Sequence, residues 1–206
     1  MFADRKEAGG RLAKALLKYK GTRVVVLTLP RGGVPVGYEI ARALECPLDT
    51  VVARKIGAPG NPEFAVGAIA PGGIEILDIP REEVAKVIRE EEAEMERRIK
   101  KYKSGTYVHS LIPDTVIVCD DGIATGKTAM AALASSRAAY PHAKLIFAAP
   151  VGAPDSIELL RRYADEVVCL ETPPSFGAVG EWYEDFPQVE DKEVVRLLET
   201  AKRTKR

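Results

Sequence analysis

The chain has 206 residues, and its 30 lysines and arginines balance its 30 aspartates and glutamates, so the formal net charge is zero. A balanced charge argues against a surface built to bind nucleic acid or an anionic membrane. No window is apolar over the length needed to cross a bilayer, and the first residues lack the form of a signal peptide. We therefore expect a cytoplasmic protein of one domain, residues 1–206, with no nucleic-acid or membrane partner.

The first quarter of the chain predicts helices that alternate with apolar strands. In order, it predicts a helix at residues 2–20, a buried strand at 23–29, a turn at 30–33, a helix at 34–44 and a second buried strand at 48–53. The strands are rich in β-branched residues and contain no alternating polar positions, which is typical of strands buried on both faces.

A different pattern follows. Residues 54–62 are rich in glycine and proline, which predicts a loop. Residues 64–70 and 73–77 flank Pro71-Gly72 and predict a β-hairpin. A long helix is expected at residues 81–103, with acids in its first half and bases in its last turns, and its charged face is expected to be solvated.

The second half returns to the alternation of strands and helices. Strands are expected at residues 115–119, 144–149 and 166–170, helices at 125–140, 154–163 and 191–201, and an irregular aromatic segment at 172–189. Strands that alternate with helices and are continuously apolar predict an α/β fold with a doubly wound, mainly parallel sheet covered on both faces.

The most specific segment is residues 116–128, which read VIVCDDGIATGKT. An apolar strand ends in Asp120 and Asp121, and a glycine- and threonine-rich turn then opens a helix. Loops at the carboxyl ends of strands bind ligands in open α/β sheets, and the free N–H groups of a helix start suit a phosphate. Two acids fit a ligand that also carries hydroxyls or Mg²⁺, so the pattern indicates a sugar phosphate with a metal.

Two alternatives compete with this interpretation. The ending Gly126-Lys127-Thr128 is also that of a nucleotide P-loop, but a P-loop requires glycine where this chain has Asp121, and a carboxylate there would repel a triphosphate. The acid pair could also cap the helix without any ligand, although capping needs only one acid.

Residues 116–128 resemble the PRPP-binding motif of type I phosphoribosyltransferases, where PRPP is 5-phosphoribosyl pyrophosphate. The resemblance implies that Asp120 and Asp121 hold the ribose hydroxyls. It implies that the 5′-phosphate is bound by the loop residues Gly122, Ile123, Ala124, Thr125, Gly126, Lys127 and Thr128. It also implies a five-stranded sheet, a hood built from about residues 1–20 and 171–206, and a long helical insertion at about residues 80–104. Dimers are common in the family, so the resemblance allows a homodimer.

A second loop, LPRGGVPVG at residues 29–37, also follows a strand and opens a helix. Arg31 supplies a forked cation suited to phosphate oxygens. In the family the loop after the first strand binds the pyrophosphate of PRPP, and Arg31, Gly32 and Gly33 match that position. Most Arg-Gly-Gly segments are simple turns. The assignment of these residues to pyrophosphate binding therefore depends on their position after the first strand. Members of a group of stand-alone phosphoribosyltransferase-domain proteins, whose substrate is unassigned, carry both segments together.

Arg54 and Lys55 end the second predicted strand. In the family a loop here closes over the site and brings a lysine or arginine to the pyrophosphate, so both residues are candidates, with ordinary strand-end charges as the alternative. Closure would protect a ribosyl cation from water.

The resemblance implies transfer of 5-phosphoribose from Mg-PRPP to a nitrogenous base or related nucleophile in nucleotide metabolism, with release of pyrophosphate. Asp120, Asp121, Arg31 and Lys55 are the expected catalytic residues. Asp120 and Asp121 would contact Mg²⁺ mainly through the substrate. The alternative is a non-catalytic PRPP sensor, although no added DNA-binding segment is visible.

The acceptor is a small molecule that the sequence does not name. Family members that use 6-oxopurines carry an acid where this chain has Ala124, which argues against hypoxanthine or guanine. In the segment at 172–189, Phe176, Trp182, Tyr183 or Phe186 could stack on an acceptor ring, or these rings could pack the last helix onto the sheet.

The composition also suggests a thermophilic source. The chain has one asparagine, Asn61, and one glutamine, Gln188, against 60 charged side chains, and scarce amides with abundant charge are typical of hyperthermophile proteins.

Overall fold

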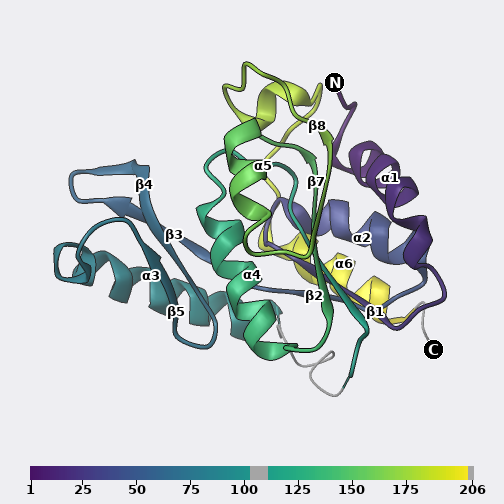
Figure 1. Cartoon of the computed structure of the whole chain (residues 1–206), viewed down its shortest axis with the longest axis horizontal. Coiled ribbons are helices and arrows are strands. Elements are labelled where there is room, and N and C mark those ends of the chain that lie inside the picture. The colour runs from purple at the N-terminus through teal and green to yellow at the C-terminus, as the bar shows by residue number, and fades with distance from the viewer. Residues whose placement is uncertain (103–110, 204–206) are drawn as a thin grey trace.

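The computed structural model describes residues 1–102 and 111–203. Its centre is a five-stranded sheet in the order β2-β1-β6-β7-β8, in which all neighbouring strands are parallel (Figure 1). The strands are β1 (Val24–Thr28), β2 (Leu48–Thr50), β6 (Thr115–Cys119), β7 (Lys144–Val151) and β8 (Glu166–Glu171). Every residue of β1 and β6 is buried, as their continuously apolar sequences predict. The predicted parallel sheet is confirmed.

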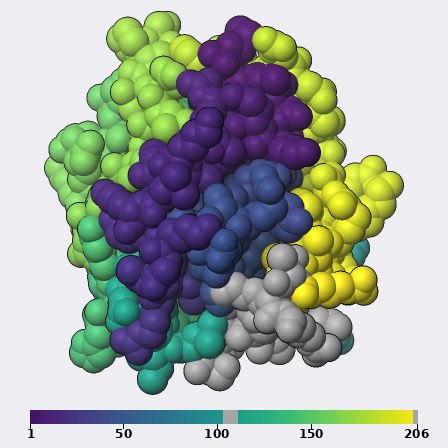
Figure 2. Space-filling view, turned by 90° about the vertical axis from the view of Figure 1, so that its right-hand side faces the viewer, coloured from purple at the N-terminus to yellow at the C-terminus, as the bar shows by residue number. Residues whose placement is uncertain are grey.

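Helices cover both faces of this sheet. One face carries α1 (Arg5–Leu16), α2 (Gly33–Leu44) and α6 (Asp191–Arg203), whose apolar residues share one core with the strands. Figure 2 shows these first, second and last helices side by side, in purple, blue and yellow. The other face carries α4 (Lys127–Ala139) and α5 (Pro154–Leu160), which build a second core. The predicted doubly wound arrangement is therefore confirmed, although the first predicted helix ends as the short 3₁₀ helix η1 (Leu17–Tyr19).

A separate lobe lies beside the main sheet (Figure 1). It consists of the long helix α3 (Arg81–Tyr102) and an antiparallel sheet of β3 (Arg54–Ala58), β4 (Asn61–Ala70) and β5 (Ile74–Leu77), and is called the α3 lobe below. Its small core is formed by Ile56, Val66, Ile69, Val84 and Ile88. The last predicted residue of the long helix, Lys103, lies outside the described residues.

The prediction of a loop at residues 54–62 is wrong, because Arg54–Ala58 is a strand paired with β4. Gly57 suggested a loop, but it serves a close approach of two strands. A Cβ atom there would lie 2.6 Å from the carbonyl oxygen of Pro62, and the pairing register shifts on both sides of Gly57. A glycine within a strand pattern often marks such a bulge. Only Pro59 and Gly60 form the turn, and the predicted hairpin becomes a three-stranded sheet.

The strand order creates a switch point between β1 and β6. The chain passes from β1 to β2 on one side and continues with β6, β7 and β8 on the other. Loops that leave the carboxyl ends of two such strands diverge, and the crevice between them is the usual ligand site of open α/β sheets. The two loops singled out in the sequence follow β1 and β6, so the fold brings them together at this crevice.

The N-terminal segment pairs with the segment that follows β8. The N–H group of Phe2 donates to the carbonyl oxygen of Trp182 at 2.8 Å. The N–H group of Glu184 donates to the carbonyl oxygen of Phe2 at 2.9 Å. Phe2 is buried against Tyr183, close to the short 3₁₀ helix η2 (Val179–Trp182). In the described part of the chain, no helix combines the length and apolar character that a membrane crossing requires.

Candidate active site

The two loops at the switch point pack directly against each other. A Cβ atom on Gly32 would collide with the carboxylate of Asp121, and one on Gly33 would lie 2.9 Å from the carbonyl oxygen of Cys119. These glycines are therefore required by close approach of the loops. The peptide bond between Pro30 and Arg31 is cis. The loop after β1 and the acid pair after β6 thus form one unit.

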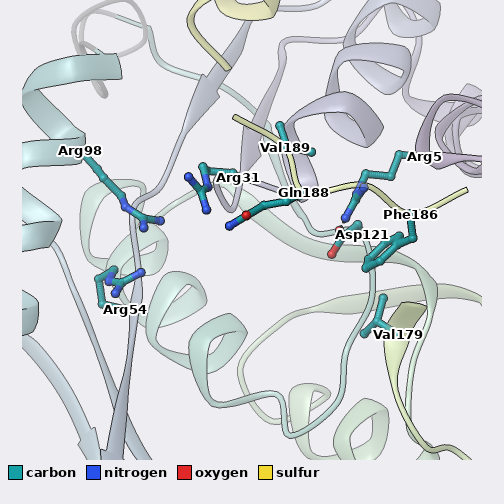
Figure 3. A pocket seen from close by; sticks show the side chains of 10 residues that line it. Arg5, Arg31, Arg54, Arg98, Asp121, Val179, Phe186, Gln188 and Val189 are labelled. Carbon is teal, nitrogen blue, oxygen red and sulfur yellow. Dashed lines mark hydrogen bonds and ion pairs between the residues drawn. The ribbon is translucent and has the colours of Figure 1, made fainter. Parts of the chain in front are cut away.

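A cavity of about 540 Å³ opens beside this unit (Figure 3). Its charged lining residues are Arg5, Arg31, Arg54, Arg98 and Asp121. Its uncharged lining residues are Gly32, Val179, Phe186, Gln188 and Val189. The cavity therefore brings together Arg31, Gly32, Arg54 and Asp121 from the sequence-predicted site residues.

The two acids have different environments. The Nε atom of Arg5 donates to Oδ2 of Asp121 at 2.7 Å, and both side chains are almost fully buried. Oδ1 of Asp120 accepts a hydrogen bond from the N–H group of Asp121 at 2.8 Å. The Asp120 carboxyl keeps some exposed surface, but surrounding atoms desolvate it and Asp121 lies beside it, so its pKa is well above the usual range. Asp120 therefore holds a proton more readily than an ordinary aspartate.

Arg5 is a site residue that sequence reasoning missed. Besides Asp121, it donates to the carbonyl oxygen of Pro187 at 2.7 Å, and its guanidinium carbon lies 3.6 Å from the ring centroid of Phe186. One signal was present: Arg5 begins α1, where the helix dipole disfavours a cation. A cation at this place needs an anionic partner, but the sequence does not indicate which one.

Three arginines, Arg31, Arg54 and Arg98, gather on the side of the cavity away from Phe186 (Figure 3); they are called the arginine cluster below. Each has a carboxylate partner that does not line the cavity. The closest nitrogen–oxygen distances are 3.7 Å for Arg31–Asp191, 2.6 Å for Arg54–Glu91 and 2.7 Å for Arg98–Glu94. The sequence predicted a solvated charged face for this helix and missed that Arg98 reaches the cavity.

Lys55 does not line the cavity, although Arg54 does. The Nζ atom of Lys55 lies 3.6 Å from a carboxylate oxygen of Glu63, a residue of β4 whose side chain is exposed. Successive side chains of a strand point to opposite faces, so only one of these neighbours can face the cavity. The catalytic role of Lys55 stays a prediction.

The predicted phosphate loop runs from Gly122 to the start of α4. Two backbone hydrogen bonds join it to the end of β7. The N–H group of Ile123 donates to the carbonyl oxygen of Val151 at 3.0 Å, and the N–H group of Ala153 donates to the carbonyl oxygen of Ile123 at 2.9 Å. Ala124 and Thr125 are exposed, and Gly126 has the positive φ of +74° that glycine favours. Lys127 forms an ion pair with Asp78. The phosphate-binding roles of residues 122–128 stay predictions.

Four aromatic residues of the segment at 172–189 were candidates for stacking on an acceptor: Phe176, Trp182, Tyr183 and Phe186. Of these four, only Phe186 lines the cavity. Its ring stacks on Tyr183, with 4.8 Å between centroids, and Arg5 also packs on it. Tyr183 is buried and donates its hydroxyl hydrogen to the carbonyl oxygen of Asp121. These rings fix the acid pair to the N-terminal segment. Gln188, which sequence reasoning did not select, places its amide in the cavity (Figure 3).

The comparison with protein families agrees with this geometry. Residues 3–186 match the model of the phosphoribosyl transferase domain family. The chain belongs to this family. Two Mycobacterium tuberculosis proteins, from strains CDC 1551 and H37Rv, are named provisionally as phosphoribosyl transferases, and each is 43% identical to this chain over 211 residues. The match covers 98% of this chain and 47% of either relative, so this chain spans about half the length of these relatives.

Solved structures extend the comparison. The crystal structure of TT1426 from Thermus thermophilus is 38% identical, with a TM-score of 0.76, and the match covers 96% of this chain and 97% of that one. The AQ2163 protein of Aquifex aeolicus is 12% identical, with a TM-score of 0.52 over 85% of this chain and 78% of its own, and shows likeness of fold alone.

Proposed function

We propose that this chain transfers 5-phosphoribose from Mg-PRPP to a nitrogen nucleophile and releases pyrophosphate. One observation carries the proposal: at the switch point of a phosphoribosyl transferase fold, the Gly32–Gly33 turn packs against Asp121 and Asp120, about 90 residues away in sequence. Of these two loops, Arg31, Gly32 and Asp121 line the cavity, and Asp120 lies next to Asp121 in the chain. The acids suit ribose hydroxyls, and Arg31 suits phosphate oxygens.

The acid pair would hold and orient the ribose. A half-protonated pair offers both a donor and acceptors to two neighbouring hydroxyls, and the raised pKa of Asp120 favours that state. Arg5 balances the charge of Asp121 and holds its carboxylate in place through the 2.7 Å contact. The negative charge of the pair lies near the ribose carbon, where an oxocarbenium-like transition state develops positive charge.

The leaving pyrophosphate would lie at the Arg31 end of the cavity. Arg31 has no hydrogen-bond acceptor among residues 1–102 and 111–203, and its nearest carboxylate, that of Asp191, is 3.7 Å away. Its donors are therefore available to phosphate oxygens, which carry the growing negative charge. The acceptor would occupy the opposite end, beside Phe186 and Val179 (Figure 3).

The residues present suit Mg²⁺ bound through the substrate. Carboxylate oxygens are ligands that Mg²⁺ prefers, but in the described ranges no group of three or more metal-ligating side chains could hold an ion without substrate. Asp120 and Asp121 would therefore contact it mainly through the ribose hydroxyls. Bound Mg²⁺ supplies positive charge that stabilises the departing pyrophosphate.

Calorimetric titration of PRPP with Mg²⁺ tests the proposal. Wild type should bind in a magnesium-dependent manner, and the Asp120→Asn/Asp121→Asn variant should bind at least about 100-fold more weakly, because two charge-assisted contacts are lost. Asp114→Asn is the matched control. Asp114 is an exposed acid that precedes the first residue of β6, at the end of the strand away from the acid pair, and it pairs with Arg23.

A screen of bases for pyrophosphate release then separates enzyme from sensor. Release with any base supports the transferase. Tight PRPP binding without release from any base supports the alternative, a PRPP sensor. Absence of PRPP binding by the wild type contradicts both functions.

A further inference from the structure

Arg98 of α3 is buried in an unusual way for an arginine on a long charged helix. Its side chain is 13% exposed, whereas that of the next residue, Arg97, is 47% exposed. Both arginines pair with Glu94. Arg97 also reaches Asp191 of α6 at 3.4 Å, whereas Arg98 lines the cavity (Figure 3). A buried cation needs an anionic partner and acceptors for its N–H groups. Glu94 accepts from only one nitrogen of Arg98.

The unsatisfied part of Arg98 faces the cavity. Its Nε atom donates to Oε1 of Glu94 at 2.7 Å. Within the described residues, neither of its two terminal nitrogens has an acceptor. Glu94 itself is held as a carboxylate, because hydrogen bonds from Arg97 and Arg98 lower its pKa to about 2. Glu94 therefore fixes the direction of Arg98 and leaves its terminal fork free.

Arg54 and Arg31 complete the cluster with different partners: Nη2 of Arg54 lies 2.6 Å from Glu91, and Nη1 of Arg31 lies 3.7 Å from Asp191. The Nε atom of Arg54 donates to Glu91 at 2.6 Å, and Glu91 also lies on α3, one turn before Glu94. None of the three carboxylate partners lines the cavity. The cavity wall therefore presents guanidinium groups from the loop after β1, from β3 and from α3. Among the residues that the structure describes, each arginine has one carboxylate partner, and the lining of the cavity beside them contains no carboxylate other than Asp121. The cluster therefore suits a compact polyanion with several acceptor oxygens.

The position of the cluster selects which anion it binds. In the cavity, Asp121 lies on one side of Arg31, and the other two arginines of the cluster, Arg54 and Arg98, lie on the other side (Figure 3). In the transfer, the bond from ribose C1 to the pyrophosphate oxygen breaks with its electron pair going to pyrophosphate. The nitrogen lone pair forms the new bond at C1 from the opposite side, and the nitrogen loses its proton to water. Leaving group and acceptor therefore occupy opposite ends, and the charged end is that of the leaving group.

We infer that Arg98 binds the leaving pyrophosphate together with Arg54 and Arg31. The inference rests on the proposed transferase function and adds a residue of α3 to its substrate contacts. It means that the α3 lobe contributes a pyrophosphate-binding wall through two elements, β3 with Arg54 and α3 with Arg98. Arg98 then stabilises the negative charge that develops as the bond to C1 breaks.

The test uses pyrophosphate, PRPP and ribose 5-phosphate, each titrated with Mg²⁺ into the full chain by calorimetry. Arg98→Gln should weaken pyrophosphate and PRPP by about tenfold or more, because one charge-assisted contact is lost, and should leave ribose 5-phosphate unchanged. Arg97→Gln is the matched control, because it removes the other partner of Glu94 and should change none of the three affinities by more than about twofold.

Each other outcome overturns the inference in a recognisable way. If Arg98→Gln binds pyrophosphate like wild type, Arg98 has no leaving-group role, while PRPP binding by wild type keeps the proposed function intact. Equal weakening of all three ligands shows a general structural effect. If Arg98→Gln does not fold by circular dichroism, Arg98→Lys retains the charge, and it should still bind pyrophosphate more weakly because it lacks the fork. If wild type binds none of the ligands, both the inference and the function fail.

Discussion

The two sides of the cavity are built in different ways. The acid side, Asp120 and Asp121, ends a central strand whose five residues are all buried, and it is packed against the Gly32–Gly33 turn. The arginine side, Arg54 and Arg98, stands on the α3 lobe, whose core contains only five fully buried apolar residues. The acid side is therefore part of the main core, so changes there should affect stability and binding together. Changes on the arginine side should affect binding alone.

Removal of Arg5 should have the largest effect and tests whether the acid side depends on the core. Arg5→Met removes the ion-pair partner of Asp121, whose side chain is only 13% exposed. We expect the free energy of unfolding to fall by about 3 kcal/mol, as for a broken buried ion pair. Urea denaturation measures the change.

Two further variants control this measurement. Lys6→Met removes an exposed charge from the same helix turn and should change stability by less than about 0.5 kcal/mol. Arg5→Met/Asp121→Asn should recover part of the loss, because no unpaired charge remains. No recovery would mean that packing on Phe186, and not the ion pair, gives Arg5 its role.

Gly32→Ala should come next and tests the contact between the two loops. Gly32 has φ of −60°, which any residue adopts, so the only obstacle is the clash of the new Cβ atom with the Asp121 carboxylate. Misplaced groups at a reaction centre can lower rates about 100-fold, and we expect a similar loss of PRPP affinity. Gly10→Ala is the control, since nothing lies within 4 Å of its Cβ position in α1. Unchanged PRPP affinity in Gly32→Ala would contradict the close packing of the loops.

Arg54 and Lys55 give a smaller effect and a direct test of the arginine side. Each substitution, Arg54→Gln or Lys55→Gln, removes one positive charge from adjacent positions of β3. We expect about tenfold weaker PRPP binding for Arg54→Gln and less than about twofold for Lys55→Gln, with stability unchanged in both. The reverse order would support the sequence-based assignment of Lys55 to catalysis and would mean that the lobe presents its other face to substrate.

The smallest effect concerns pH and the acid pair. The pKa of Asp120 is higher in the folded chain than in the unfolded one, so its contribution to stability is full below the unfolded pKa and is lost as pH rises through the folded pKa. Asp120→Asn should therefore be more stable than wild type near pH 8, and the two should converge below about pH 4. Urea denaturation over a pH series measures this.

Asp114→Asn should behave in the opposite sense. A hydrogen bond from Arg23 lowers the pKa of Asp114, so its contribution is present above the unfolded pKa and is lost as pH falls. A stability difference of the same sign in both variants would show that Asp120 is not desolvated.

The sequence by itself determined the central sheet and the location of the acid pair. The strand at 115–119 was predicted with its observed bounds, because a continuous β-branched run between turn residues has few alternatives. The carboxyl ends of parallel strands share one edge of the sheet, so the sequence pattern predicts that the loops after β1 and β6 lie at the same edge. The local pattern and the fold rule were sufficient to place Arg31, Gly32, Asp120 and Asp121 at neighbouring loops of this edge, and their roles stay predictions.

The tertiary structure alone decided the partners of these residues. Arg5 and Asp121 are 116 positions apart, and no local pattern connects them. Arg98 looked like a helix-surface charge, and only the packing of α3 on β3 turns it toward the cavity. The sequence does not distinguish Arg54 from Lys55, and the pleat of β3 directs their side chains to opposite faces. Such choices depend on which surfaces meet, and a one-dimensional pattern does not contain that information.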